Sequence, residues 1–189
     1  MRIVKYIFIG CFVLLLLVNC SKENNFLIEK GQVGLINNET IVDDLKTLFY
    51  KDSLVSNLSS NPENENKLFS NKNDEYLVFS KTGKKLLEIV PVVENDSTSK
   101  IKSIQIFDAD YKTIKGLSLL SSFKDVNQNY IVDNIETTLT SATLFIDELN
   151  ATIAIDKKEL GLNPFSREQV TLDQIPDIAK IKYFTIWFN

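Results

Sequence analysis

The sequence predicts an α+β fold in which antiparallel sheets are combined with two short helices. Two observations support this prediction. After residue 50, most apolar residues alternate with polar ones, which is the pattern of half-buried strands. Two short stretches change to a helical period, and each opens with a hydroxyl residue followed three positions later by Asp. Since a turn at 81–84 joins two of the alternating segments as a hairpin, we expect antiparallel pairing.

The first helix is expected to begin at Thr40, with Asp43 reaching back to the same turn as in a capping box. Short β segments precede it at 26–28 and 31–36, and a polar loop is expected at 59–74. The apolar stripe of this helix should comprise Ile41, Leu45, Leu48 and Phe49. Strands are then expected at 52–58, 75–80, 85–93 and 101–108.

The same pattern restarts at Ser122, which Asp125 follows three residues later. The apolar stripe of this second helix should comprise Phe123, Val126 and Tyr130. Strands are expected at 130–137, 142–147, 152–156 and 180–188. Residues 157–178, with Gly161 and two prolines, form the longest irregular connection.

The two helix starts lie in matching surroundings. Gly34 precedes Thr40 by six residues, and Gly116 precedes Ser122 by six. Two interpretations stay open: a duplicated helix-plus-four-strand unit, or the chance recurrence of a common cap. Under the first, two small sheets join into one long antiparallel sheet or face each other. The expected boundaries are one domain at 26–189, with repeat halves at 31–108 and 113–189.

The last strand, KIKYFTIWF, alternates at first and is then apolar on both faces. This is typical of a central strand that is paired on both edges, so the C-terminal residues should be integral to the fold. We expect the core to contain its aromatic side chains Tyr183, Phe184, Trp187 and Phe188.

The N-terminus has the layout of a secretory signal. Arg2 and Lys5 precede an apolar run at 6–18, which is shorter than the roughly 20 residues that span a bilayer. The run ends in Leu17-Val18-Asn19-Cys20. This tetrapeptide resembles the lipobox of bacterial lipoproteins, although Gly or Ala is commoner than Asn before the cysteine.

The resemblance implies that a diacylglycerol is attached to Cys20 and that the chain is cut before it. Residues 1–19 would then be the signal peptide, residues 20–25 a lipidated tether, and the membrane a partner through the anchor on Cys20. Ser21 stands where inner-membrane lipoproteins carry Asp, so the resemblance implies an outer-membrane location. The periplasmic leaflet and the cell-surface leaflet both stay open.

Composition excludes several functional classes. Without residues 1–19 the chain keeps 19 basic and 25 acidic side chains, a net charge of −6, and has no basic cluster, so no nucleic-acid partner is expected. Histidine is absent, and lipid would consume Cys20. Zinc sites of His and Cys and His-dependent nucleophiles are therefore excluded. We expect no catalytic residue, no metal site and no cofactor, and we expect that the protein is not an enzyme.

Three short motifs are candidate sites. Asp108 and Asp110 could hold calcium, but the loop lacks the Gly and later Glu of a calcium loop, so a solvated turn is favoured. Asp52-Ser53-Leu54 and Asp96-Ser97-Thr98 resemble the short O-glycosylation motif of Bacteroidota. That resemblance implies glycans at Ser53 and Ser97.

As an architecture, residues 31–189 resemble small periplasmic α+β modules such as the β-lactamase inhibitor protein, which presents a concave sheet face to a partner. No contact residue carries over. The chain resembles uncharacterised Bacteroidota envelope lipoproteins more closely. These resemblances imply a lipid-anchored envelope protein that binds a protein or a glycan. The alternatives are a structural subunit of an envelope assembly, or a carboxylate-based hydrolase.

Overall fold

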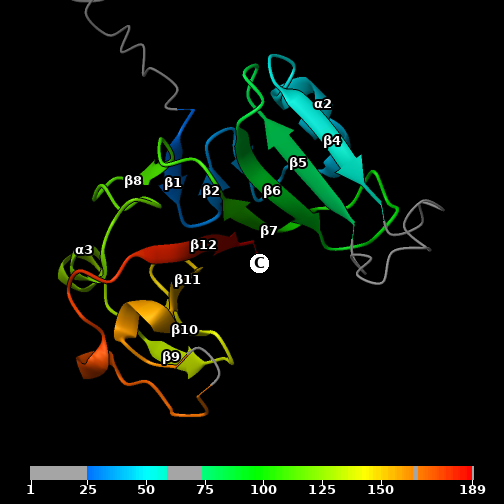
Figure 1. The fold of residues 1–189 in the computed structure, drawn as a ribbon. Coiled ribbons are helices and arrows are strands. Elements are labelled where there is room, and N and C mark those ends of the chain that lie inside the picture. Colours follow the sequence, from blue (N-terminus) through cyan, green and yellow to red (C-terminus); the bar gives the residue numbers. More distant parts are fainter. Residues whose placement is uncertain (1–24, 59–73, 164–165, 189) are drawn as a thin grey trace, which may run out of the picture.

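The computed structural model describes residues 25–58, 74–163 and 166–188. In these residues it shows two sheets and two short α-helices, which confirms the predicted α+β class (Figure 1). The expected signal peptide, Cys20 and most of the expected tether lie outside them. The larger sheet is antiparallel, with its eight strands in the order β4-β5-β6-β7-β12-β11-β10-β9. Its strands are β4 Ser53–Asn57, β5 Glu75–Phe79, β6 Lys85–Pro91, β7 Ile101–Ile106, β9 Asn134–Thr137, β10 Ser141–Ile146, β11 Ala151–Asp156 and β12 Ile181–Trp187.

A smaller sheet joins the start of the described chain to its middle. Its strand order is β3-β2-β1-β8, and β1 pairs with β8 in parallel. The β segment expected at 26–28 is present here, and the one expected at 31–36 is a pair of two-residue strands separated by a turn at 34–35. β8 was not predicted, because two residues are too few to show a period. The strands are β1 Leu27–Glu29, β2 Gln32–Val33, β3 Ile36–Asn37 and β8 Lys112–Thr113.

Both helices pack on one face of the larger sheet. The first is a 3-10 turn, η1 (Val42–Asp44), that continues into α2 (Leu45–Leu48), and the second is α3 (Phe123–Asn129). Two further 3-10 turns, η3 (Lys157–Leu160) and η4 (Leu172–Gln174), lie in the long connection before β12. The helical side chains and the strand side chains below them form one buried core, in which Val42 takes the place expected for Ile41. From the helices and the residues that follow them, that core receives Val42, Leu45, Phe49, Phe123, Val126 and Tyr130.

The predicted cap of the first helix is wrong by one residue. The helix is capped at Ile41 rather than at Thr40. The Ile41 amide donates to Oδ2 of Asp44, three residues later, at 3.0 Å. The Thr40 hydroxyl instead belongs to the preceding turn, where its Oγ1 accepts a hydrogen bond from the Asn37 amide at 3.0 Å. Because the hydroxyl is already engaged in that turn, the helix begins one residue later than expected.

The second cap is confirmed as predicted. The amide and hydroxyl of Ser122 donate to Asp125 Oδ2 at 2.7 and 3.0 Å. These two hydrogen bonds lower the pKa of the Asp125 carboxyl. Tyr130, however, ends this helix, and its hydroxyl donates to Thr113 Oγ1 at 2.7 Å. The strand expected from residue 130 therefore begins only at Asn134.

We expect Asp125→Ala to lower the free energy of unfolding at pH 7 by about 1 kcal/mol, since it removes a helix cap. Because the folded-state pKa of Asp125 is lowered, this stabilisation is present above the unfolded pKa of about 3.9 and is lost as the pH falls through the folded value. Urea unfolding at pH 7 and at pH 3 measures both effects. Asp43→Ala, at an exposed site without a capping bond, is the control; equal losses in the two variants would contradict the cap assignment.

The helix-plus-four-strand unit occurs twice in the structure. η1 and α2 precede β4 to β7, and α3 precedes β9 to β12. In each unit, the first two helical amides donate to the connection that leads into the last strand. These bonds join Val42 to Ser99 (3.0 Å), Asp43 to Ser97 (2.9 Å), Phe123 to Ala179 (2.8 Å) and Lys124 to Asp177 (3.0 Å).

The last strands of the two units also match. Lys-Ile-Lys opens both, at 100–102 and 180–182. In both, the ladder to the preceding strand skips the second lysine, which is a β-bulge. β7 and β12 pair with each other, and Gln105 lies opposite Thr185. The two units are therefore joined at the centre of one continuous sheet, which is the first of the two arrangements considered from the sequence.

β12 is a central strand, as its composition predicted, because it pairs with both β7 and β11. Phe184 and Ile186 point into the core and are fully buried, whereas Tyr183 on the opposite side is 44 % exposed. The expectation of a core position is thus confirmed for Phe184 and Phe188 and wrong for Tyr183 and Trp187, which lie on the opposite side of the strand. Among the described residues, no helix is both long enough and apolar enough to cross a membrane.

Candidate functional site

The face of the larger sheet that points away from the helices carries a row of apolar side chains that are not part of the core. In Figure 1, α2 lies behind β4 and β5, and no described helix lies in front of them. We call this surface the open face. Strand alternation places apolar side chains from seven of the eight strands on it or at its strand ends, each half-buried or exposed. They are Val55, Leu77, Phe79, Val90, Phe107, Phe145, Ala154, Tyr183 and Trp187.

Polar contacts hold two aromatic rings of the open face in place. Lys85 Nζ lies 3.7 Å from the centre of the Phe107 ring and forms an ion pair with Glu88 Oε2 at 2.6 Å. The Trp187 indole donates from Nε1 to Thr152 Oγ1 at 3.1 Å. Rings that are oriented before binding lose less side-chain entropy when a partner arrives. The open face thus combines fixed aromatic rings with paired polar groups.

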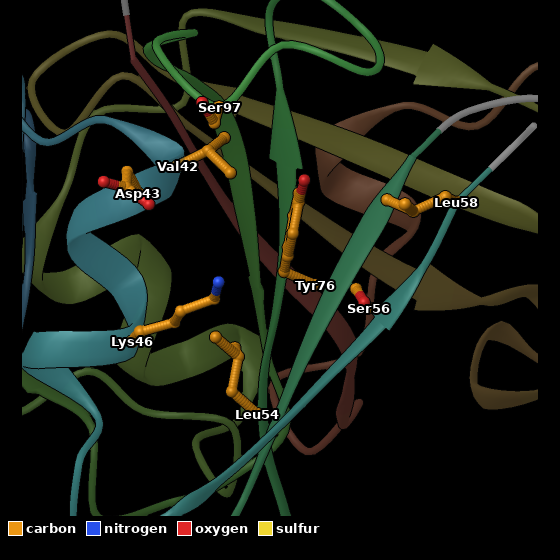
Figure 2. A pocket seen from close by; sticks show the side chains of 8 residues that line it. All are labelled: Val42, Asp43, Lys46, Leu54, Ser56, Leu58, Tyr76 and Ser97. Carbon is orange, nitrogen blue, oxygen red and sulfur yellow. The ribbon is translucent and has the colours of Figure 1, made fainter.

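A groove lies on the other side of the sheet, between the first helix and the strands at its edge. Its cavity volume is about 290 Å³. Figure 2 shows its walls, with η1 and α2 on one side and β4 and β5 on the other. We call it the α2 groove, and it is lined by Val42, Asp43, Lys46, Leu54, Ser56, Leu58, Tyr76 and Ser97.

Several polar side chains that line the α2 groove, among them Asp43, Lys46 and Tyr76, have no ion-pair or side-chain hydrogen-bond partner among the described residues. In Figure 2 the Lys46 amine points towards the strands, and Lys46 makes no ion pair with any residue that the structure describes. Tyr76 forms no side-chain hydrogen bond within that part of the chain. Burial, and then the negative charge of Asp74, raises the pKa of its phenol. The hydroxyl therefore stays protonated at neutral pH and can donate as well as accept.

The expectation of a solvated turn at Asp108 and Asp110 is confirmed for Asp110, which is exposed, and wrong for Asp108. Asp108 is only 5 % exposed and forms an ion pair with Lys84 at 2.7 Å. Its Oδ1 also accepts the Asp110 amide at 3.1 Å. The neighbouring Tyr111 is buried, and this burial raises the pKa of its phenol far above the ordinary value. The turn folds back onto the core because Tyr111 packs there, and that places Asp108 inside.

The residues proposed for modification lie at separate places. Ser53 begins β4, Ser97 lies in the β6–β7 turn beside the α2 groove, and both are exposed. Beside Ser97, Asp96 Oδ1 accepts from the amide and the hydroxyl of Thr98 at 2.8 and 2.7 Å. Glycosylation at the two serines stays a prediction, and so does lipidation at Cys20, outside the described residues. In the part of the chain that is described, no group of three or more potential metal ligands occurs.

The sequence reasoning did not find the α2 groove. Its residues come from four segments, and although Asp43, Leu54 and Ser97 belong to motifs, no motif joins these segments to one another. One signal was present: the connection before the last strand is much longer in the second unit than in the first. When the two units are aligned, the difference in length shows that the first unit lacks a segment that the second unit has before its last strand.

Comparisons with known proteins inform on the fold. No family model matches the sequence, and no curated protein matches it. Among solved structures, the chain is similar to the uncharacterized protein yfeY from Escherichia coli, with a TM-score of 0.50 and 13 % sequence identity. The match covers 86 % of this chain and 99 % of that one. At this identity the similarity shows a shared fold.

Proposed function

We propose that this protein is a lipid-anchored lipoprotein of the bacterial outer membrane that binds another protein through the open face. The observation that carries the proposal is the row of half-buried and exposed aromatic and aliphatic side chains on a broad sheet face, with two rings held by polar contacts and no described helix in front of β4 and β5. Aromatic residues are enriched at protein interfaces. A binding role also suits a sequence without histidine.

A protein partner is favoured over a glycan by the shape and content of the face. Its apolar side chains are spread over seven strands rather than gathered in one pocket, and aliphatic residues such as Val55, Leu77 and Val90 accompany the rings. Interfaces between proteins commonly bury about 800 Å² on each partner. A face of this breadth can supply such an area.

A photo-cross-linking amino acid at Tyr183 tests the proposal in native envelopes. We expect a light-dependent protein adduct at this position and none at Ile114, which is 77 % exposed but lies outside the open face. Trp187→Ala should reduce the yield of the adduct. No adduct, or equal adducts at both positions, would contradict the proposal. An adduct removed by glycosidases but not by proteases would assign the face to a glycan.

The anchor has its own test. We expect labelled palmitate to be incorporated into the wild-type protein and not into Cys20→Ala, and the variant should leave the membrane fraction, since the acyl chains supply the attachment. Proteolysis of intact cells then distinguishes the two leaflets. Labelling that persists in Cys20→Ala would contradict the lipid anchor at Cys20 but would not bear on the binding proposed for the open face.

A further inference from the structure

The α2 groove has a counterpart in the second unit, and there it is filled by the chain itself. Between β6 and β7 the connection comprises residues 92–100, whereas between β11 and β12 it comprises residues 157–180. Both connections start at the same end of the sheet and finish at the same bonds to a helix start. The 15 additional residues therefore belong to a detour that only the second unit makes.

The detour crosses the region between β9 and α3. At its outer end the Val170 amide donates to Thr137 Oγ1, at the end of β9, at 2.8 Å. At its inner end the carbonyl of Asp177 accepts the Lys124 amide of α3 at 3.0 Å. Between these points Val170 and Ile175 are 3 % and 5 % exposed and belong to the core, and Leu172 packs against it.

The sheet register identifies the matching positions. Because the bulges at Lys102 and Lys182 are equivalent, each residue of β7 corresponds to the residue 80 positions later in β12. The residues paired across successive strands then match position by position, from the central strands β7 and β12 to the edge strands β4 and β9. The corresponding pairs are Ile104 and Phe184, Ile89 and Ile153, Tyr76 and Leu144, and Ser56 and Ile135.

Two residues after Ser56 and Ile135, Leu58 corresponds to Thr137, whose hydroxyl accepts the hydrogen bond of the Val170 amide. Leu58 and Tyr76 line the α2 groove and stay half-exposed, because no described segment crosses the first unit at this point. The groove is thus the open form of a site that, in the second unit, takes an irregular segment with Val170, Leu172 and Ile175, which includes the 3-10 turn η4.

Lys46 distinguishes the open groove from the filled one. The helix starts correspond at Ile41 and Ser122, so Lys46 corresponds to Asn127. The positive charge therefore has no equivalent in the second unit. The Lys46 amine points towards the strands and forms no ion pair among the described residues, not even with Asp43, which lines the same groove. It can therefore pair with an acidic group of an occupant.

We propose that the α2 groove binds a peptide segment of a partner protein in an irregular conformation like that of residues 170–175, with aliphatic side chains spaced as in Val170, Leu172 and Ile175 and an acidic residue for Lys46. A main-chain amide of the segment would donate to the Tyr76 hydroxyl, as the Val170 amide donates to Thr137 Oγ1 in the second unit. This site lies on the opposite side of the sheet from the open face. It therefore does not depend on the function proposed above.

The probe is a fluorescein-labelled peptide with the sequence of residues 166–177, SREQVTLDQIPD, which carries the three aliphatic residues and three acids. Fluorescence anisotropy measures its binding to the full-length protein purified in detergent. We expect saturable binding that is lost when the peptide carries Val170→Ser, Leu172→Ser and Ile175→Ser. Leu54→Glu in the groove should weaken binding roughly tenfold or more, since an apolar contact is replaced by a charge.

Lys46→Glu and Asn127→Glu form a matched pair of variants, because both replace an exposed residue at the same helical position of the two units. Lys46→Glu should weaken binding several-fold, and Asn127→Glu should leave it unchanged. Thermal melts followed by circular dichroism confirm that each variant is folded. Absence of saturable binding, equal binding of the serine peptide, or equal losses in the two Glu variants would overturn the proposal.

Two other occupants would show themselves in the same experiment. If a second copy fills the groove, the protein is a dimer that Leu54→Glu dissociates, and the peptide does not bind the wild type. If the chain's own residues 59–73 fill it, the peptide binds only after these residues are replaced by the short β9–β10 connection at 138–140. Either result would overturn the proposal.

Discussion

A chain that ends at Lys180 is expected not to fold. It lacks β12, the strand that pairs with β7 on one edge and β11 on the other and thereby joins the two units. It also loses the buried side chains of Phe184, Ile186 and Phe188. Fully burying one such side chain contributes about 1.5–3 kcal/mol, so three of them approach the whole stability of an ordinary domain, about 5–15 kcal/mol.

Circular dichroism and limited proteolysis measure this effect. The truncated chain should show no cooperative unfolding transition and should be digested rapidly. A synthetic peptide spanning residues 180–188, added in excess, should restore the transition, because it supplies the missing ladder and the missing core together. A truncated chain that unfolds cooperatively without the peptide would show that the first unit is stable without β12.

Phe184→Ala is expected to lower the free energy of unfolding by about 3–5 kcal/mol, the usual loss for a buried phenylalanine. Phe184 is fully buried in the central strand and lies opposite Ile106 on one side and Ile153 on the other. The cavity would therefore open in the middle of the sheet, where neighbouring strands cannot move inwards without breaking their ladders.

The adjacent residue supplies the control. Tyr183 precedes Phe184 on the same strand but points to the open face and is 44 % exposed. Tyr183→Ala should cost less than about 1 kcal/mol, because little buried area is lost. Chemical denaturation of both variants at pH 7 measures the difference. Equal losses would mean that the open face is covered in solution and would also weaken its assignment as a binding surface.

Local pattern was sufficient to predict most of the elements. The eight strands of the large sheet could be predicted because the residues of each strand alternate between apolar and polar on their own, without reference to the other strands. The cap at Ser122 and Asp125 could be predicted for the same reason, since its partners are three residues apart. The first cap was predicted one residue early, because Thr40 and its competing partner Asn37 form a turn that the pattern does not distinguish from a helix start.

Only the folded chain shows which faces stay uncovered. Tyr76 and Lys46 are thirty residues apart in sequence, and nothing near either one predicts that they line the same groove. The groove exists because the β6–β7 connection is short where the β11–β12 connection is long, so it depends on aligning two units through a sheet register. Burial of Asp108 was missed for a similar reason, because Tyr111, whose packing turns Asp108 inwards, and Lys84, its ion-pair partner, reach their places only in the folded chain. Periodicity and capping act within a few residues and can be recognised locally, whereas coverage of a surface is a property of segments that meet only after folding.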